Sequence, residues 1–331
     1  MASHIERRKF LATLGGAAAA WPLAARAQQP TPIVGLINSR SAQDAVRNVA
    51  AFRKGLDETG YVEGQNLMVE YHWLDGQYHR LPSLVDDLIR RRVDVIATPA
   101  FRAGAKAAKA ATSTIPIVFG VGDDPVKLGL VASLARPGGN ATGVNSFNTE
   151  VVAKRLGLLH DLLPKAVRIV VLVNPANAPI AEATLREVPE AARALGLQIR
   201  VFNASTSREI EAAFASLGRD PADALYVAGE GFFISRRVQF ATLATRYGIP
   251  AIYSNREFPE VGGLMSYGTD GLDTWHQVGI YTSRILKGAK PADLPVLQSS
   301  KFEFVINLQT ARALGIEVPN SIQLLADEVI E

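Results

Sequence analysis

The carboxylates with the best spacing for chemistry are Asp123 and Asp124, which directly follow the apolar run of residues 115–121. Two neighbouring carboxylates after a strand could act as a general acid and a general base. Pro125 comes next, and proline is common in the first turn of a helix, so the pair could instead cap a helix and hydrogen-bond a ligand. We favour the second interpretation because no nucleophile or partner base lies nearby in the sequence.

The sequence offers little support for a metal site, a cofactor site or a nucleophile. The two closest histidines, His72 and His79, are seven residues apart, whereas a zinc-binding pair on one helix needs a spacing of about four. The chain has no cysteine, which excludes disulfides, thiolate metal sites and a cysteine nucleophile. Glycine-rich phosphate loops and the G-x-S-x-G elbow are also missing. We therefore expect no catalytic residue, no metal and no cofactor.

A second set of residues, mostly short polar side chains with a few aromatic rings, follows the predicted strands. Open α/β sheets bind ligands at these positions, although each residue could instead cap a helix or form a turn. Such a set suits reversible binding of a small polar or zwitterionic ligand. The predicted ligand-binding residues are Ser39, Ser41, Trp73, Thr98, Phe101, Gly122, Asp123, Asn145, Asn174, Glu230, Phe232, Asn255, Arg256, Tyr267 and Asp270.

A ligand carboxylate would need a cationic or amide donor, and a guanidinium offers a bidentate fit. Arg256 follows the predicted strand 250–253, and Arg102 is its rival in the first half of the chain. Arg256 could equally pair with Glu257 or Glu260 at the surface, where it would contribute little. The sequence leaves these alternatives open.

Other members of the set would contact the rest of such a ligand. An ammonium group would need an acceptor, which Asp123 or Glu230 could supply. Trp73, Phe101 and Phe232 could cover an apolar or aromatic portion.

These side chains must be positioned by strands and helices that alternate along the chain, a pattern typical of parallel sheets flanked by helices. The predicted strands are 33–38, 67–73, 93–98, 115–121, 168–173, 198–202, 225–227, 250–253, 263–267 and 302–306. The predicted helices are 43–59, 81–89, 103–111, 126–134, 151–163, 180–195 (broken or bent near Pro189), 208–217, 237–247, 275–286 and 311–314. The sequence therefore predicts an α/β protein with two similar halves, joined around residues 143–150.

Residues 1–27 have the layout of an export signal. A basic run at 7–9 precedes the apolar stretch 10–25, and Ala25-Arg26-Ala27 provides a small-x-small cleavage site. The paired arginines of the basic run predict the twin-arginine route, which carries folded proteins. The alternatives are a general secretory signal or an N-terminal amphipathic helix.

The leader also explains the charge of the chain. Its four basic residues and one acid account for the formal net charge of +3, so the mature chain is neutral. A neutral chain has no basic stripe for nucleic acid, and no second apolar run is long enough to cross a bilayer. We expect a soluble monomer in the periplasm.

Five stretches of the chain resemble the sequences of one known protein family. They read VAAFRKGLDETGYVEGQNLMVEYHW, RLPSLVDDLIRRRVDVIAT, IPIVFGVGDDPVKLGLVASLARPGGNATGV, IPAIYSNREFPEVGGLMSYG and VGIYTSRILKGAKPADLPV. Together with the leader, they resemble the ABC-transporter substrate-binding proteins of the tryptophan/tyrosine type. The resemblance covers essentially the whole mature chain.

The resemblance implies the fold of a type I periplasmic binding protein, with two Rossmann-like lobes, parallel sheets and a three-segment hinge around a cleft. It implies an N-terminal lobe of residues 28–147 and 268–298, and a C-terminal lobe of residues 148–267 and 299–331. The crossovers are expected near Phe147, Tyr267 and Gln298.

The resemblance also implies a function: the solute-binding component of an ABC uptake transporter, which binds an amino-acid-like or aromatic solute by hinge closure and serves an inner-membrane permease. Two alternatives stay open. One is an exported α/β enzyme that uses Asp123, Asp124 or Glu230, and the other is a periplasmic sensor, since closure exposes a new surface in both sensing and transport.

The sequence departs from many relatives after the third predicted strand. They have glycine, threonine, proline and small residues there, whereas this chain has ATPAFR at 97–102. The bulky Phe101 and Arg102 could narrow the pocket, carry specificity or lie on the flank of the helix. The resemblance therefore does not carry over the identity of the solute.

Overall fold

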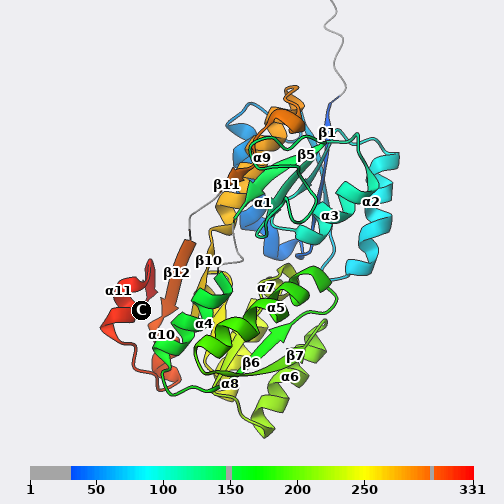
Figure 1. Ribbon diagram of the computed structural model, residues 1–331. Helices are drawn as coiled ribbons and strands as arrows, with labels where there is room; N and C mark the ends of the chain where they lie inside the picture. The colour runs from blue at the N-terminus through cyan, green and yellow to red at the C-terminus, as the bar shows by residue number, and fades with distance from the viewer. Residues whose placement is uncertain (1–30, 147–150, 299–301) are drawn as a thin grey trace, which may run out of the picture. The chain divides into compact units, whose positions relative to one another are not determined.

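Strands and helices alternate along the chain and form two sheets in a computed structural model, which describes residues 31–146, 151–298 and 302–331 (Figure 1). The expected leader and the crossover near Phe147 lie outside the described residues. No helix within the described ranges combines the length and the apolar character needed to cross a membrane. The α/β class predicted from the sequence is confirmed.

The first sheet is entirely parallel and has the strand order β11-β5-β4-β3-β1-β2. Its strands are β1 (Ile33–Asn38), β2 (Met68–Trp73), β3 (Val95–Thr98), β4 (Ile117–Val121), β5 (Ala141–Asn145) and β11 (Leu297–Gln298). Every residue of β3, β4 and β5 is buried, which explains why these strands are continuous runs of apolar and small residues without alternation.

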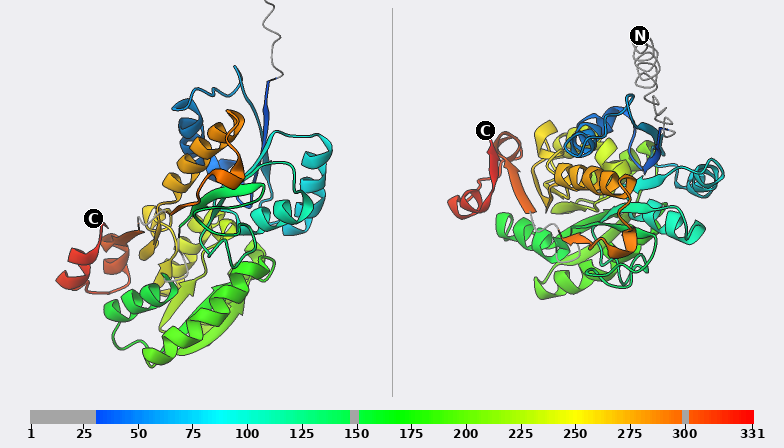
Figure 2. Two further views of the ribbon diagram at one scale, coloured as in Figure 1. Left: turned by 45° about the horizontal axis from the view of Figure 1, so that its top comes forward. Right: turned by 90° about the horizontal axis from the view of Figure 1, so that it is seen from above.

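Helices cover both faces of this sheet. They are α1 (Val46–Asp57), α2 (Leu81–Arg90), α3 (Arg102–Ala111) and α9 (Gly271–Leu286), with short 3-10 turns at Gln43–Ala45, Tyr78–Arg80 and Pro291–Asp293. Helix α9 comes from late in the sequence, yet it packs against α1 and against β3, β4 and β5 (Figures 1 and 2). We call this sheet and its helices the N-terminal lobe.

The helices α1 and α9 approach until their backbones touch. A Cβ atom added at Gly55 would lie 2.1 Å from the carbonyl oxygen of His276, and one added at Gly279 would lie 2.2 Å from that of Phe52. Glycine is therefore required at both positions, because no side chain fits between the two helices.

The second sheet has the strand order β13-β12-β10-β9-β8-β6-β7, and only the β10–β12 pair is antiparallel. Its strands are β6 (Arg168–Val173), β7 (Gln198–Asn203), β8 (Ala224–Val227), β9 (Ala251–Tyr253), β10 (Met265–Thr269), β12 (Phe302–Asn307) and β13 (Glu328–Ile330). Around them lie α4 (Val151–Leu162), α5 (Ala178–Ala194), α6 (Ser207–Arg219), α7 (Gly231–Ser235), α8 (Arg237–Tyr247), α10 (Leu308–Ala313), α11 (Asn320–Leu325) and a 3-10 turn at Pro259–Val261. We call this sheet and its helices the C-terminal lobe.

Several predicted elements differ from the structure. The predicted helix 126–134 is wrong: a single turn after Pro125 ends at Gly129, whose φ of +72° is left-handed, and Leu130 is then buried in the core. Helix α5 runs unbroken through Pro189, and β10 extends to Thr269 rather than to Tyr267.

Candidate functional site

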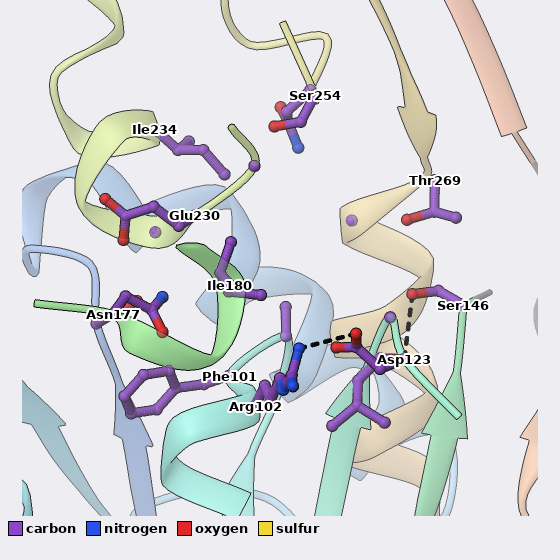
Figure 3. Close-up of a pocket in the computed structure, with 18 of the residues that line it drawn as sticks. Phe101, Arg102, Asp123, Ser146, Asn177, Ile180, Glu230, Ile234, Ser254 and Thr269 are labelled. Carbon is purple, nitrogen blue, oxygen red and sulfur yellow. Dashed lines mark hydrogen bonds and ion pairs between the residues drawn. The ribbon is translucent and has the colours of Figure 1, made fainter. Parts of the chain in front are cut away.

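A cavity of about 170 Å³ lies between the two lobes, at the carboxyl ends of strands from both sheets (Figure 3). The N-terminal lobe lines it with the segments that follow β1, β3, β4 and β5 and with the first turns of α9. The C-terminal lobe lines it with α4, α5 and the segments that follow β8 and β9. Figure 3 shows Phe101, Arg102 and Asp123 on one side, and Glu230, Ile234 and Ser254 on the other. This is the position where open α/β sheets bind ligands.

Part of the predicted set lies on the cavity wall. Six of the predicted ligand-binding residues line it: Ser39, Phe101, Gly122, Asp123, Glu230 and Asn255. Phe101 is almost fully buried and packs against Tyr78, with ring centroids 6.0 Å apart. Phe101 and Arg102 both form part of the cavity wall. Their contact with a ligand stays a prediction.

The other nine predicted residues do not line the cavity. They are Ser41, Trp73, Thr98, Asn145, Asn174, Phe232, Arg256, Tyr267 and Asp270. Their positions follow from local structure that the sequence pattern did not reveal.

Four of these nine residues show why a residue near a strand end can lie away from the cavity. Thr98 and Asn145 are fully buried at the ends of β3 and β5. Ser41 donates its hydroxyl to Asp44. Asp270 caps helix α9, where its carboxylate accepts a hydrogen bond from the backbone N–H of Leu272 at 2.9 Å.

Two of the aromatic residues predicted to cover the ligand, Trp73 and Phe232, pack against protein instead, and so does Tyr267. Trp73 stacks on Tyr71 and on Trp275, with ring centroids 5.9 and 6.4 Å apart. Phe232 belongs to the core of the C-terminal lobe. Tyr267 stacks on Phe302 at 5.8 Å. Trp275, which the sequence placed on a helix face, is the tryptophan that lines the cavity.

Arg256, the first candidate for a carboxylate clamp, lies outside the cavity. Its guanidinium pairs with Glu260 at 2.8 Å, Glu303 at 3.4 Å and Glu328 at 2.6 Å. Hydrogen bonding to Glu260 and the neighbouring carboxylates raise the pKa of Arg256. The structure therefore agrees with the alternative interpretation, in which Arg256 forms ion pairs at the surface.

Arg102, its rival, lies on the cavity wall and is already paired. Its Nη1 is 2.8 Å from Oδ1 of Asp123, and both side chains are about 15% exposed (Figure 3). Burial raises the pKa of Asp123, while Arg102 lowers it. Asp124 accepts a hydrogen bond from the backbone N–H of Val126 at 2.9 Å, but it holds a turn there and not the helix that the pair was expected to cap.

Glu230 is buried and its carboxylate is fully used by protein donors. It accepts hydrogen bonds from the backbone N–H groups of Phe232 and Phe233, which begin helix α7, and from Nδ2 of Asn174. The fourth donor is the hydroxyl of Tyr78, which belongs to the N-terminal lobe. Burial raises the pKa of Glu230 and, more strongly, that of Tyr78. Glu230 thus links the two lobes at the cavity.

Further contacts hold the lobes together over the cavity. Arg40 forms a bidentate pair with Glu257 at 2.9 and 3.0 Å. A Cβ atom added at Gly231 would lie 2.0 Å from Oγ of Ser39 in the other lobe. Further ion pairs between the lobes are Arg237–Asp44, Arg236–Asp75 and Arg47–Glu260. The two lobes are therefore in direct contact beside the cavity.

The sequence analysis missed Arg155, which lines the cavity from helix α4 and is only 5% exposed. Its Nε donates to the carbonyl oxygen of Tyr267 at 2.6 Å, and its Nη1 to the hydroxyl of Tyr226 at 3.3 Å. A signal was present, because Arg155 lies four residues from Val151 and Leu159 on the apolar face of the predicted helix.

The described residues offer no group of three or more histidine, aspartate or glutamate side chains placed to hold a metal ion. Several polar groups on the cavity wall are hydrogen-bonded within the protein, and the wall also carries apolar side chains such as Phe101, Ile180 and Ile234. Such an enclosed, mixed surface suits the reversible binding of a small solute.

Comparison with known proteins identifies the family. Residues 34–330 match the family described as ABC transporter substrate binding protein. A protein named "Tyrosine-binding protein" from Clostridioides difficile (strain R20291) is 30% identical over 272 residues, which cover 80% of this chain and 76% of that protein.

Two solved structures are similar over most of the chain. An ABC domain from Streptococcus pneumonia in complex with L-Trp has a TM-score of 0.79 and 26% identity, and the match covers 91% of this chain and all of the other. The ligand-free, open structure of a substrate-binding protein with adhesive properties from Clostridium difficile has a TM-score of 0.60 and 25% identity, with 91% and 99% covered. The chain belongs to the ABC transporter substrate-binding protein family.

Proposed function

We propose that this protein binds a small amino-acid-like or aromatic solute in the cavity between its lobes, returns it unchanged, and delivers it to an inner-membrane ABC permease. The observation that carries the proposal is the cavity between the lobes, at the carboxyl ends of both sheets. The names of two relatives, one called tyrosine-binding and one solved with L-Trp, support an aromatic amino acid as the first solute to test. The protein acts as a monomer in the periplasm and uses no cofactor.

The cavity wall offers chemistry for both parts of such a solute. Ile180 and Ile234, which line the cavity and are partly exposed, supply apolar surface for a side chain. Of the two acceptors predicted for an ammonium group, Asp123 is the better candidate, because Glu230 already accepts four hydrogen bonds. Binding is then a matter of hydrogen bonding and closure, without a reacting group.

The two lobes, residues 28–147 with 268–298 and residues 148–267 with 299–331, move about a three-segment hinge. Support comes from the ion pairs between them, which only a closed form makes. The protein is also more similar to the L-Trp complex than to the ligand-free, open structure, although the sequence identities are almost equal. The solute favours the closed form because only that form surrounds it.

Addition of L-tyrosine or L-tryptophan is expected to reduce the radius of gyration in solution scattering. Calorimetry should show binding at one site, and the free energy of unfolding should rise by about 2.7 kcal/mol when the solute is at a hundredfold excess over its dissociation constant. Mass spectrometry of the solute released by denaturation should recover it unchanged. Tight binding without compaction would contradict hinge closure, and a chemically altered solute would favour an enzyme.

The paired arginines of the leader are expected to direct export. The double variant Arg7→Lys with Arg8→Lys should keep the precursor inside the cell, because the twin-arginine route reads both guanidinium groups. Cell fractionation measures the result, with Arg26→Lys as a control that changes an arginine outside the pair. Normal periplasmic accumulation of the double variant would leave only the general secretory route.

A further inference from the structure

The guanidinium of Arg155 is buried at the cavity and is hydrogen-bonded only to neutral groups. Its two hydrogen-bond acceptors are the carbonyl oxygen of Tyr267 and the hydroxyl of Tyr226. Among residues 31–146, 151–298 and 302–331, no carboxylate lies within ion-pair distance of it. A charge in such a place costs several kcal/mol unless an opposite charge compensates it.

The other arginines on the cavity wall provide a direct comparison. Arg40 pairs with Glu257 at 2.9 Å, and Arg102 pairs with Asp123 at 2.8 Å. Arg155 is less exposed than either carboxylate partner of these two, yet within the described part of the chain it has no acidic partner of its own. A solute that enters the cavity can supply the charge that the described residues do not provide.

Two glycines of the C-terminal lobe lie close to the guanidinium of Arg155. A Cβ atom added at Gly229 would lie 3.9 Å from Nη1 of Arg155, and one added at Gly268 would lie 3.4 Å from Nη2. Both glycines also approach Ser254, which lines the cavity on the side of the C-terminal lobe (Figure 3). The two positions without side chains thus keep the guanidinium close to the cavity and to the hydroxyl of Ser254.

We propose that Arg155 is the anion-binding residue of the cavity and that the solute carries a carboxylate, which becomes the counter-ion of this guanidinium on binding. The proposal rests on the proposed function, since it requires that the cavity holds a solute. It replaces Arg256 and Arg102 as the carboxylate clamp, because both of these are occupied by protein carboxylates. It also defines a substrate class: acids bind, and amines without an acid group do not.

The test combines variants of the protein with analogues of one probe. Calorimetry compares L-tyrosine, tyramine (which lacks the carboxylate) and 3-(4-hydroxyphenyl)propanoate (which lacks the ammonium group) on the wild type, Arg155→Met, Arg155→Lys and the control Arg256→Met. The wild type should bind the two carboxylates and not tyramine. Arg155→Met should lose at least thirtyfold in affinity for L-tyrosine. Arg155→Lys should lose less, and Arg256→Met should bind as the wild type does.

The coupling between variant and analogue separates ion pairing from a structural role. In Arg155→Met, the advantage of L-tyrosine over tyramine should disappear, because the charge that reads the carboxylate is gone. If Arg155 only supports the fold, the variant weakens all probes alike, and that outcome would overturn the proposal. Binding of tyramine as tightly as L-tyrosine by the wild type would overturn it as well, while the proposed solute-binding function stands.

The same measurements distinguish a failure of the anion-binding proposal from a failure of the proposed function. If the propanoate binds as well as L-tyrosine, the anion site is supported and the amino-acid part of the proposed function is wrong. If the wild type binds none of the probes, the proposal of an aromatic solute is wrong. The unfolding temperatures of the ligand-free wild type and of Arg155→Met then test whether Arg155 carries an uncompensated charge. An equal or higher temperature for Arg155→Met supports an uncompensated charge, and a lower one overturns the proposal.

Discussion

Replacing Gly279 with alanine is expected to lower the free energy of unfolding by about 3 kcal/mol, at the upper end of the usual cost of overpacking. The new Cβ atom would lie 2.2 Å from the carbonyl oxygen of Phe52, which is backbone and cannot rotate away. Helices α1 and α9 would have to separate, and both pack on the N-terminal sheet. Denaturant unfolding followed by circular dichroism measures the loss.

The control is Gly157→Ala in helix α4, where the added Cβ atom meets nothing within 4 Å. Alanine there should stabilise the protein by about 0.5–1 kcal/mol, since it restricts the unfolded chain and favours the helix. Equal changes in the two variants would mean that the contact between α1 and α9 is not as close as the structure shows.

Replacing Glu257 with glutamine is expected to weaken solute binding by about 2–5 kcal/mol. Glu257 does not line the cavity, so the effect comes from closure: the variant leaves Arg40, whose side chain is 6% exposed, buried without its acid partner. In an open form water solvates Arg40, and the stability of the ligand-free protein should change little. Calorimetry with L-tyrosine gives the affinity, and scattering should show a larger radius of gyration than for the wild type.

The matched control is Arg47→Gln, which removes another ion pair between the lobes. Its partner is Glu260, and the side chain of Arg47 is 61% exposed, so the pair should contribute at most about 1 kcal/mol to closure. If both variants lose the same affinity, burial of the Arg40–Glu257 pair has no special part in closure.

The sequence predicted the fold well where the pattern is local. Periodic apolar residues placed helices such as α3 and strands such as β6 within one residue of their observed bounds. Strand β5 was not predicted because Ala141–Asn145 is a run of small and polar residues that becomes buried only between β4 and β11. Strands β11 and β13 are two and three residues long, too short for any periodicity.

The candidate site was predicted less completely, for a physical reason. The rule that ligands bind at strand ends found Ser39, Gly122 and Asp123 on the cavity wall. It missed the residues that helices contribute, such as Arg155 and Trp275, because these residues lie within helices and not at strand ends.

Arg256 was wrongly expected at the ligand because its ion-pair partners are distant in the sequence. Its partners Glu303 and Glu328 are 47 and 72 residues away in the sequence, so local spacing could not reveal that they occupy its guanidinium.

The late position of α9 in the chain affects how the protein is made. Trp275 and Val278 cover one face of the N-terminal sheet, but the ribosome synthesises them only after strands β6 to β10 of the other lobe. Until then, the nascent chain carries an N-terminal half with apolar surface open to the cytosol, a condition in which chains aggregate or recruit chaperones. Neither half is a contiguous segment, so the polypeptide cannot mature one domain at a time.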